Sequence, residues 1–114
     1  MTKAEDIVQA QLDAYNTRDL ARFVACYAED ARVYRPPVAE PSLAGRAALA
    51  AHYGAHRFNL PALHADLVSR MLLGNQVVDH ERVHGVTEQP FEAVVVYEVN
   101  AAGLIAAVWF FNAD

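Results

Sequence analysis

The two halves of this 114-residue sequence carry different hydrophobic patterns, and this division limits the possible fold most strongly. In the first half, apolar residues recur every three to four positions, which predicts amphipathic helices; one such set is Leu20, Phe23, Val24 and Tyr27. From His64 onward the pattern changes to short apolar or alternating runs separated by turn residues, which predicts strands. Helices followed by successive strands predict an α+β domain, with the helices packed on one face of a curved antiparallel sheet.

The expected elements can be placed along the chain. A capping box at residues 2–5, with Thr2 as the cap and Glu5 reaching back, begins the first helix. A second helix begins at Leu20 and ends before residues 29–30, a short strand covers residues 31–35, and a third helix covers residues 46–57. The four strands expected in the second half cover His64–Leu73, Gln76–His84, Phe91–Val99 and residues 104–111.

Composition excludes several classes of function. The formal net charge is −5 and no basic run is interleaved with aromatic residues, so we expect no nucleic-acid partner. The single cysteine, Cys26, permits neither an internal disulfide nor a cysteine-based zinc site. No segment resembles a signal peptide or a membrane span, so we expect one cytoplasmic domain over residues 1–114 with no membrane partner.

The strand Gln76–His84 is unusual because both of its faces carry ionisable side chains. Side chains alternate between the two faces of a strand. One face therefore carries Val77, Asp79, Glu81 and Val83, and the other carries Val78, His80, Arg82 and His84. Burying an unpaired charge costs several kcal/mol. Whichever face is buried, its ionisable groups must therefore be paired or functional.

The last two strands are apolar on both faces. Helices can cover only one face of a sheet, and a large exposed apolar face on the other side is uncommon in a monomer. We therefore expect a homodimer that forms through the outer face of the sheet, with Trp109 as an interface anchor.

Several segments resemble the nuclear transport factor 2-like superfamily, which includes ketosteroid isomerases and SnoaL-type polyketide cyclases. They are Tyr-Asn-Thr-Arg-Asp-Leu at residues 15–20, Tyr-Ala-Glu-Asp-Ala at 27–31, Gly-Arg-Ala-Ala-Leu at 45–49, Gly-Leu-Ile at 103–105 and Val-Trp-Phe-Phe at 108–111. The resemblance covers nearly the whole chain. It implies a cone-shaped sheet that curls around a pocket, and a dimer, but it does not fix the chemistry because this fold carries many activities.

The resemblance does not extend to the ketosteroid isomerase mechanism. The three catalytic positions of those enzymes fall on Gln11, Arg35 and Val95, none of which has the required side chain. The same matching turns the face with Asp79 and Glu81 toward the pocket. A comparison with limonene epoxide hydrolase, also of this superfamily, would instead turn Arg82 and His84 inward; we favour the first register.

In that register the pocket could carry out acid–base chemistry without a cofactor. Glu81 or Asp79 would be the general acid or base, Arg35 would stabilise negative charge, and Tyr15 would donate a hydroxyl. Residues expected to bind the ligand are Tyr34, His52, Tyr53, Val77, Val83, Val95, Tyr97, Val108 and Phe110. We expect no metal, since His52 and His56 have no obvious third ligand.

Three functions remain open from the sequence. The first is a small enzyme of the isomerase, cyclase, dehydratase or hydrolase type that acts on an apolar, oxygen-bearing molecule. The second is a non-catalytic protein that binds a small molecule in the same pocket. The third is a dimeric interaction module that works through the outer face of the sheet, with the pocket filled by side chains. A separate alternative to any functional role is that Asp79 and Glu81 only form structural ion pairs with Arg35 or Arg70.

Overall fold

The helices are placed by short polar signals and by their apolar faces. A computed structural model of the chain describes residues 3–112, so the expected capping contact of Thr2 lies outside the described residues. Helix α1 covers Lys3–Asn16, α2 covers Leu20–Ala25 and α3 covers Arg46–His56. The carboxylate of Asp19 caps α2 by accepting a hydrogen bond from the backbone N–H of Arg22 at 3.1 Å.

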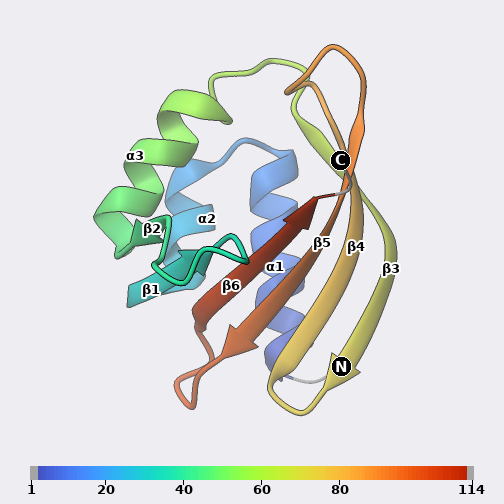
Figure 1. Ribbon diagram of the computed structural model, residues 1–114. Coiled ribbons are helices and arrows are strands. Elements are labelled where there is room, and N and C mark those ends of the chain that lie inside the picture. The colour runs from blue at the N-terminus through green and yellow to red at the C-terminus, as the bar shows by residue number, and fades with distance from the viewer. Residues whose placement is uncertain (1–2, 113–114) are drawn as a thin grey trace.

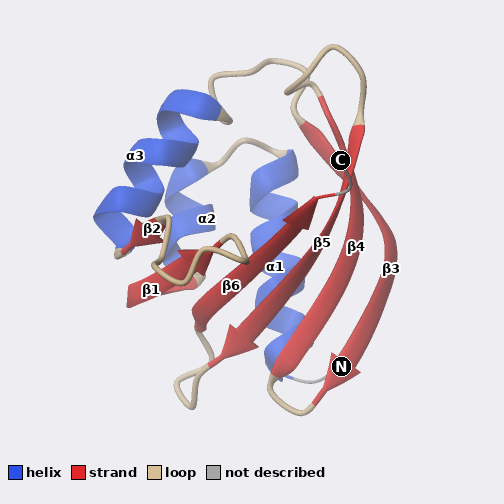
Figure 2. Ribbon diagram, viewed as in Figure 1, coloured by secondary structure: helices blue, strands red, loops and turns tan. Residues whose placement is uncertain are grey.

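Six strands form one curved sheet around these helices (Figure 1). They are β1 (Tyr27–Tyr34), β2 (Leu43–Ala44), β3 (His64–Leu73), β4 (Gln76–His84), β5 (Phe91–Val99) and β6 (Ile105–Asn112). Their order across the sheet is β2-β1-β6-β5-β4-β3. Figure 2 shows the helices gathered on one side of the sheet, which confirms the expected α+β fold.

One pairing differs from the expected antiparallel sheet. Strand β1 lies parallel to β6, whereas every other neighbouring pair is antiparallel. The chain leaves β1 through β2 and α3 and then forms the β3–β6 meander, so that the last strand returns beside the first. Parallel neighbours require such a long connection. The sheet is therefore mixed.

The early boundaries also differ from the prediction. Strand β1 begins at Tyr27 rather than at residue 31, and α2 ends at Ala25. Tyr27 fits the helical spacing after Leu20, but it is buried as the first residue of β1. The two-residue strand β2 was not predicted, because so short a segment has no periodicity. The four later strands match their predicted ranges within one residue.

The core lies between the helices and the inner face of the sheet. The largest apolar side chains that are almost completely buried are Val8, Phe23, Leu49, Leu63, Val77, Val95, Ile105 and Val108. Strand β4 contributes its odd-numbered residues to this interior, and both Asp79 and Glu81 are buried with them. The register that would have turned Arg82 and His84 inward is not the one in the structure, because Arg82 is exposed and His84 is half-buried outside the core.

Candidate functional site

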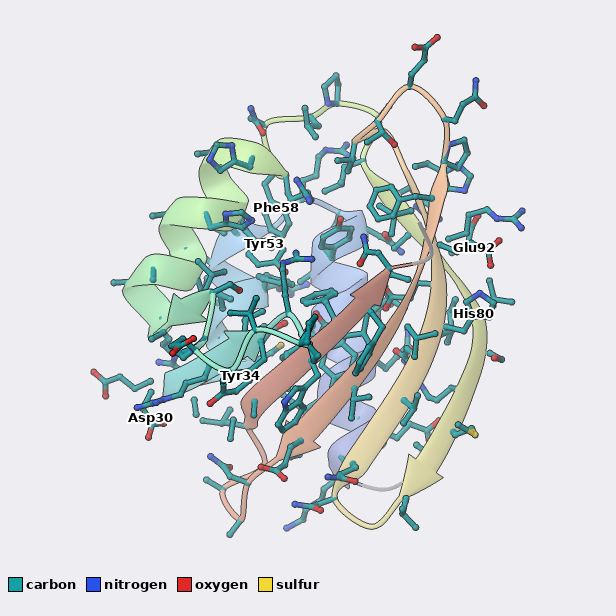
Figure 3. All side chains as sticks on the ribbon, in the orientation of Figure 1. Asp30, Tyr34, Tyr53, Phe58, His80 and Glu92 are labelled. Atoms are coloured by element: carbon teal, nitrogen blue, oxygen red, sulfur yellow. The ribbon has the colours of Figure 1, made fainter. Side chains whose placement is uncertain are left out.

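A cavity lies between the helices and the inner face of the sheet, with Glu81 in its wall. Its volume is about 70 Å³. Helices α1 and α2 supply part of its lining, including Tyr15, and α3 supplies His52 and Tyr53. The inner face of the sheet supplies most of the remaining wall. Figure 3 shows Tyr53 and Phe58 between α3 and the sheet, while His80 and Glu92 point away from the helices. An engineered apolar cavity of about 150 Å³ holds benzene, so this one encloses only a few heavy atoms.

Glu81 is the ionisable group that the fold leaves unsatisfied. Its side chain is 6 % exposed, and Oε2 is the one buried side-chain polar atom without a hydrogen-bond partner within residues 3–112. Burial, followed by repulsion from Asp79, raises the pKa of Glu81 to about 7, against opposing effects of Arg70 and a hydrogen bond with Tyr97. A carboxyl with this pKa can accept or donate a proton at neutral pH.

Asp79 is buried on the same face but is fully paired. Arg70 on β3 donates two hydrogen bonds to it, Nε to Oδ1 at 2.7 Å and Nη2 to Oδ2 at 3.0 Å. The same guanidinium donates to Gln9 on α1 at 2.9 Å and lies 3.8 Å from a carboxylate oxygen of Glu5. These contacts make Asp79 part of a structural network that joins the sheet to α1.

A chain of neutral polar groups leads to Glu81. The hydroxyl of Tyr27 donates to the side-chain oxygen of Gln11 at 3.2 Å, and the amide of Gln11 donates to the hydroxyl of Tyr97 at 3.1 Å. Tyr97 in turn hydrogen-bonds with Glu81. All four side chains are buried, and the three hydrogen bonds hold Glu81 in place from one side while Oε2 stays free.

Cationic side chains lie near the mouth of the cavity. Arg35, at the end of β1, is exposed, and its guanidinium lies 4.9 Å from the centre of the Phe110 ring. Arg57, just after α3, is half-buried and hydrogen-bonds with the hydroxyl of Tyr15. Burial, with repulsion from Arg57, His56 and Arg35, lowers the pKa of His52. His52 is therefore neutral at pH 7 and presents a hydrogen-bonding ring rather than a further charge.

The remaining wall is aromatic. The rings of Tyr15, Phe23, Tyr53 and Phe58 form a cluster with centroid separations from 4.7 to 6.4 Å. Burial raises the pKa of Tyr53 to about 12 and raises that of Tyr15 as well, so both hydroxyls stay protonated at pH 7. They can act as hydrogen-bond donors but not as bases.

The cavity gathers many of the residues named from the sequence. Those in its lining are Tyr15, Arg35, His52, Tyr53, Glu81, Val83, Tyr97 and Phe110. Val77, Val95 and Val108 do not line it; they are packed in the core. Asp79 does not line it either, because its carboxylate is turned to Arg70.

The placement of Tyr34 as a ligand-binding residue is corrected. Its ring stacks on Trp109 with a centroid separation of 5.5 Å and an interplanar angle of 14°. Val33 is the neighbour whose side chain is buried, so the alternation of β1 turns Tyr34 to the outer face of the sheet. The sequence could have indicated this, since Ala31 and Val33 form the apolar row of that strand.

Several lining residues were not among the predicted site residues, notably Gln11, Tyr27, Arg57, Phe91 and Asn112. Gln11 falls on the apolar face of α1, and a polar residue in such a row is a usable sign of a buried hydrogen bond. Arg57 and Asn112 lie at the ends of elements, where the hydrophobic period does not predict which way a side chain points. Tyr27 was assigned to the wrong element.

Two features are absent from the described part of the chain. Between residues 3 and 112, no three side chains of the histidine, cysteine, aspartate or glutamate type come together as metal ligands would. No helix within the same range has the length and apolar character needed to cross a bilayer.

The sequence matches one known family of domains. The family model described as "SnoaL-like domain" matches residues 8–108. No protein of curated function matches the sequence.

Solved structures resemble the chain over nearly its whole length. An uncharacterized cystatin-fold protein from Novosphingobium aromaticivorans is 23% identical, with a TM-score of 0.84 over 97% of this chain and 98% of that one. A putative ketosteroid isomerase from Kribbella flavida is 21% identical, with a TM-score of 0.83 over 98% and 78% of the two chains. A computationally designed 17-OHP binder is 16% identical, with a TM-score of 0.83 over 97% and 92%. At these identities the similarity shows a shared fold alone.

Proposed function

This chain belongs to the SnoaL-like domain family, and from that premise we propose that its cavity carries out cofactor-free acid–base chemistry on a small, oxygen-bearing molecule. Glu81 transfers a proton to or from the carbon next to a carbonyl group. The observation that carries the proposal is the free Oε2 atom of Glu81, buried in the cavity wall with no partner. A buried polar atom of this kind costs stability, and function is a physical reason to retain it.

The proton transfer balances within the cavity. The ionised Glu81 accepts a proton from the carbon next to the carbonyl through Oε2. The electron pair of that C–H bond becomes the carbon–carbon double bond of an enolate, and the carbonyl π pair moves onto oxygen. Returning the proton to the same or another carbon completes an exchange or an isomerisation and restores the carboxylate.

Other lining groups suit the charge that develops during this step. The negative charge on the enolate oxygen needs donors that stay protonated, and the hydroxyls of Tyr15 and Tyr53 meet this requirement. The guanidinium of Arg35 supplies positive charge in the same cavity. Asp79 is not proposed as the base, because both of its oxygens accept hydrogen bonds from Arg70.

The test is proton exchange in heavy water. Small ketones, beginning with 2-butanone, are incubated with the protein, and loss of the signals of the protons next to the carbonyl is followed by ¹H NMR. We expect exchange above the buffer rate that falls about 10²- to 10⁴-fold in Glu81→Gln, the usual contribution of a general base. Glu92→Gln is the matched control, since Glu92 lies on the outer face of the sheet bound to His80. Equal exchange by Glu81→Gln and the wild type would refute the assignment.

The second candidate function is binding without catalysis. It is favoured by the likeness in fold to a computationally designed 17-OHP binder. If this function is the correct one, no ketone exchanges above the buffer rate, and Glu81→Gln changes only the affinity for a bound compound.

We also propose that the protein forms a homodimer through the outer face of the sheet. That face carries the stacked pair Tyr34 and Trp109 beside the partly exposed Val94 and Phe111. Sedimentation should give a dimer for the wild type and a monomer for Phe111→Glu, because an unpaired charge there would be buried in the interface. Leu73→Glu, at the exposed edge of β3, is the control and should remain dimeric. A monomeric wild type would refute this proposal.

A further inference from the structure

The cavity carries opposite charges at different depths. Glu81, Tyr97 and Gln11 are buried at its inner wall. Arg35 is exposed and Arg57 is half-buried, and both belong to the lining of the same cavity. A molecule that enters therefore meets the two guanidiniums before it meets the carboxyl.

Neither of these guanidiniums is neutralised by a carboxylate in the described part of the chain. Arg70 and Arg82 form ion pairs with acids, whereas Arg57 donates from Nη1 to the backbone oxygen of His56 at 2.9 Å and Arg35 rests on the ring of Phe110. The chain has 14 acidic residues against 9 basic ones, so acids are not scarce. Two guanidiniums that no carboxylate neutralises within residues 3–112 are, at one cavity, a suitable site for an anion.

Arg35 and Arg57 both act on the residues that α3 contributes to the cavity. Each guanidinium lowers the pKa of His52 and opposes the rise in the pKa of Tyr53. Arg70 lowers the pKa of Glu81, but its guanidinium is already bound to Asp79. Arg35 and Arg57 are consequently available to bind a charged group of the substrate while Oε2 of Glu81 faces its other end.

We propose that the substrate of this cavity is a small oxoacid, whose carboxylate binds to Arg35 and Arg57 while the carbon next to its carbonyl group faces Glu81. This inference rests on the proposed proton transfer by Glu81 and adds the class of molecule. The volume of about 70 Å³ agrees with a short chain, because only a few atoms beyond the carboxylate need to be enclosed. The guanidiniums also offset the repulsion that a carboxylate substrate would meet from ionised Glu81.

The test compares two probes of the same shape and different charge. The first is 2-oxobutanoate, and the second is 2-oxobutanamide, in which a neutral amide replaces the carboxylate. Binding is measured by calorimetry, and exchange of the protons next to the ketone is measured by NMR in heavy water. We expect the oxoacid to bind at least about tenfold more tightly than the amide, as two charge-assisted contacts would provide.

Variants then assign the preference to the two arginines. In the double variant Arg35→Gln/Arg57→Gln the ratio of the two affinities should fall to about one. Each single variant should reduce the ratio, which keeps the test valid if the double variant does not fold. Arg82→Gln removes a cation from the outer face of the sheet and should leave the ratio as in the wild type.

The outcomes separate this inference from the function on which it rests. Equal affinity for acid and amide, with exchange of both, would overturn the oxoacid inference and leave the role of Glu81 intact. Arginine-dependent binding of the oxoacid without any exchange would overturn the proton transfer and retain the anion site. Absence of both binding and exchange would overturn both proposals.

Discussion

Asp79 and Glu81 lie two residues apart on the same face of β4, and they differ in their hydrogen-bond and ion-pair partners. Arg70 holds both oxygens of Asp79, and through Gln9 it joins that part of the sheet to α1. Glu81 lines the cavity and hydrogen-bonds with the hydroxyl of Tyr97, while its Oε2 atom is buried without a hydrogen-bond partner among the described residues. The comparison teaches that burial alone does not decide the state of a carboxyl, because Asp79 has a cation bound to both oxygens and Glu81 has none within residues 3–112.

The largest effect on stability is expected when the paired carboxyl is removed. Asp79→Asn leaves the guanidinium of Arg70, 9 % exposed, without its main counter-charge. Breaking a buried ion pair in this way costs about 3–5 kcal/mol. Urea unfolding at pH 7 measures the loss. If Asp79→Asn were as stable as the wild type, the structural role of this pair would be wrong.

At Glu81, the carboxyl without a cation, removal of the charge is expected to stabilise the folded protein at neutral pH. The pKa of Glu81 is higher in the folded protein, about 7, than its ordinary value of 4.5. Its contribution to stability is therefore complete below pH 4.5 and is lost as the pH rises through 7. At 1.36 kcal/mol for each pH unit, the loss is about 3 kcal/mol.

Glu81→Gln carries no such charge and should not lose this stability. Relative to the wild type it should gain up to about 3 kcal/mol between pH 4.5 and pH 8, measured by urea unfolding at both values. Glu29→Gln serves as the control and should keep the wild-type pH dependence in this range, since Glu29 is exposed on β1. A parallel pH dependence of Glu81→Gln and the wild type would contradict the unpaired state of Glu81.

The smallest effect concerns the hydroxyl that reaches Glu81. The hydrogen bond from Tyr97 lowers the pKa of Glu81, so Tyr97→Phe should raise it further, by about one unit, and move the pH profile of ketone exchange to higher pH. Tyr27→Phe removes a hydroxyl from the same chain that bonds to Gln11 instead. An equal shift in both variants would show that the effect does not pass through the Tyr97 contact.

Much of the fold could be predicted from the sequence, because the hydrophobic pattern changes from a helical to a strand period at His64 and turn residues mark the strand ends. The parallel position of β1 could not, since it depends on the pairing of β1 with β6, two strands that lie far apart in the chain. The inward row of β4 was favoured because Val77 and Val83 share its parity.

The two carboxyls of that row could not be told apart from the sequence. Their difference is set by Arg70 on the neighbouring strand β3, whose register against β4 places it opposite Asp79 and not opposite Glu81. Arg35 was equally available as a partner in the sequence, yet it lies on Phe110. Pairing across strands is a property of the assembled sheet, and local pattern does not specify it.

The protonation of Glu81 can be observed directly by ¹³C NMR of its side-chain carboxyl carbon, assigned by its disappearance in Glu81→Gln. If this carboxyl is the free proton-transfer group of the cavity, its chemical shift titrates with a midpoint near pH 7. A midpoint near 4.5 would mean that water or a cation reaches it in solution, and the central assignment would be wrong.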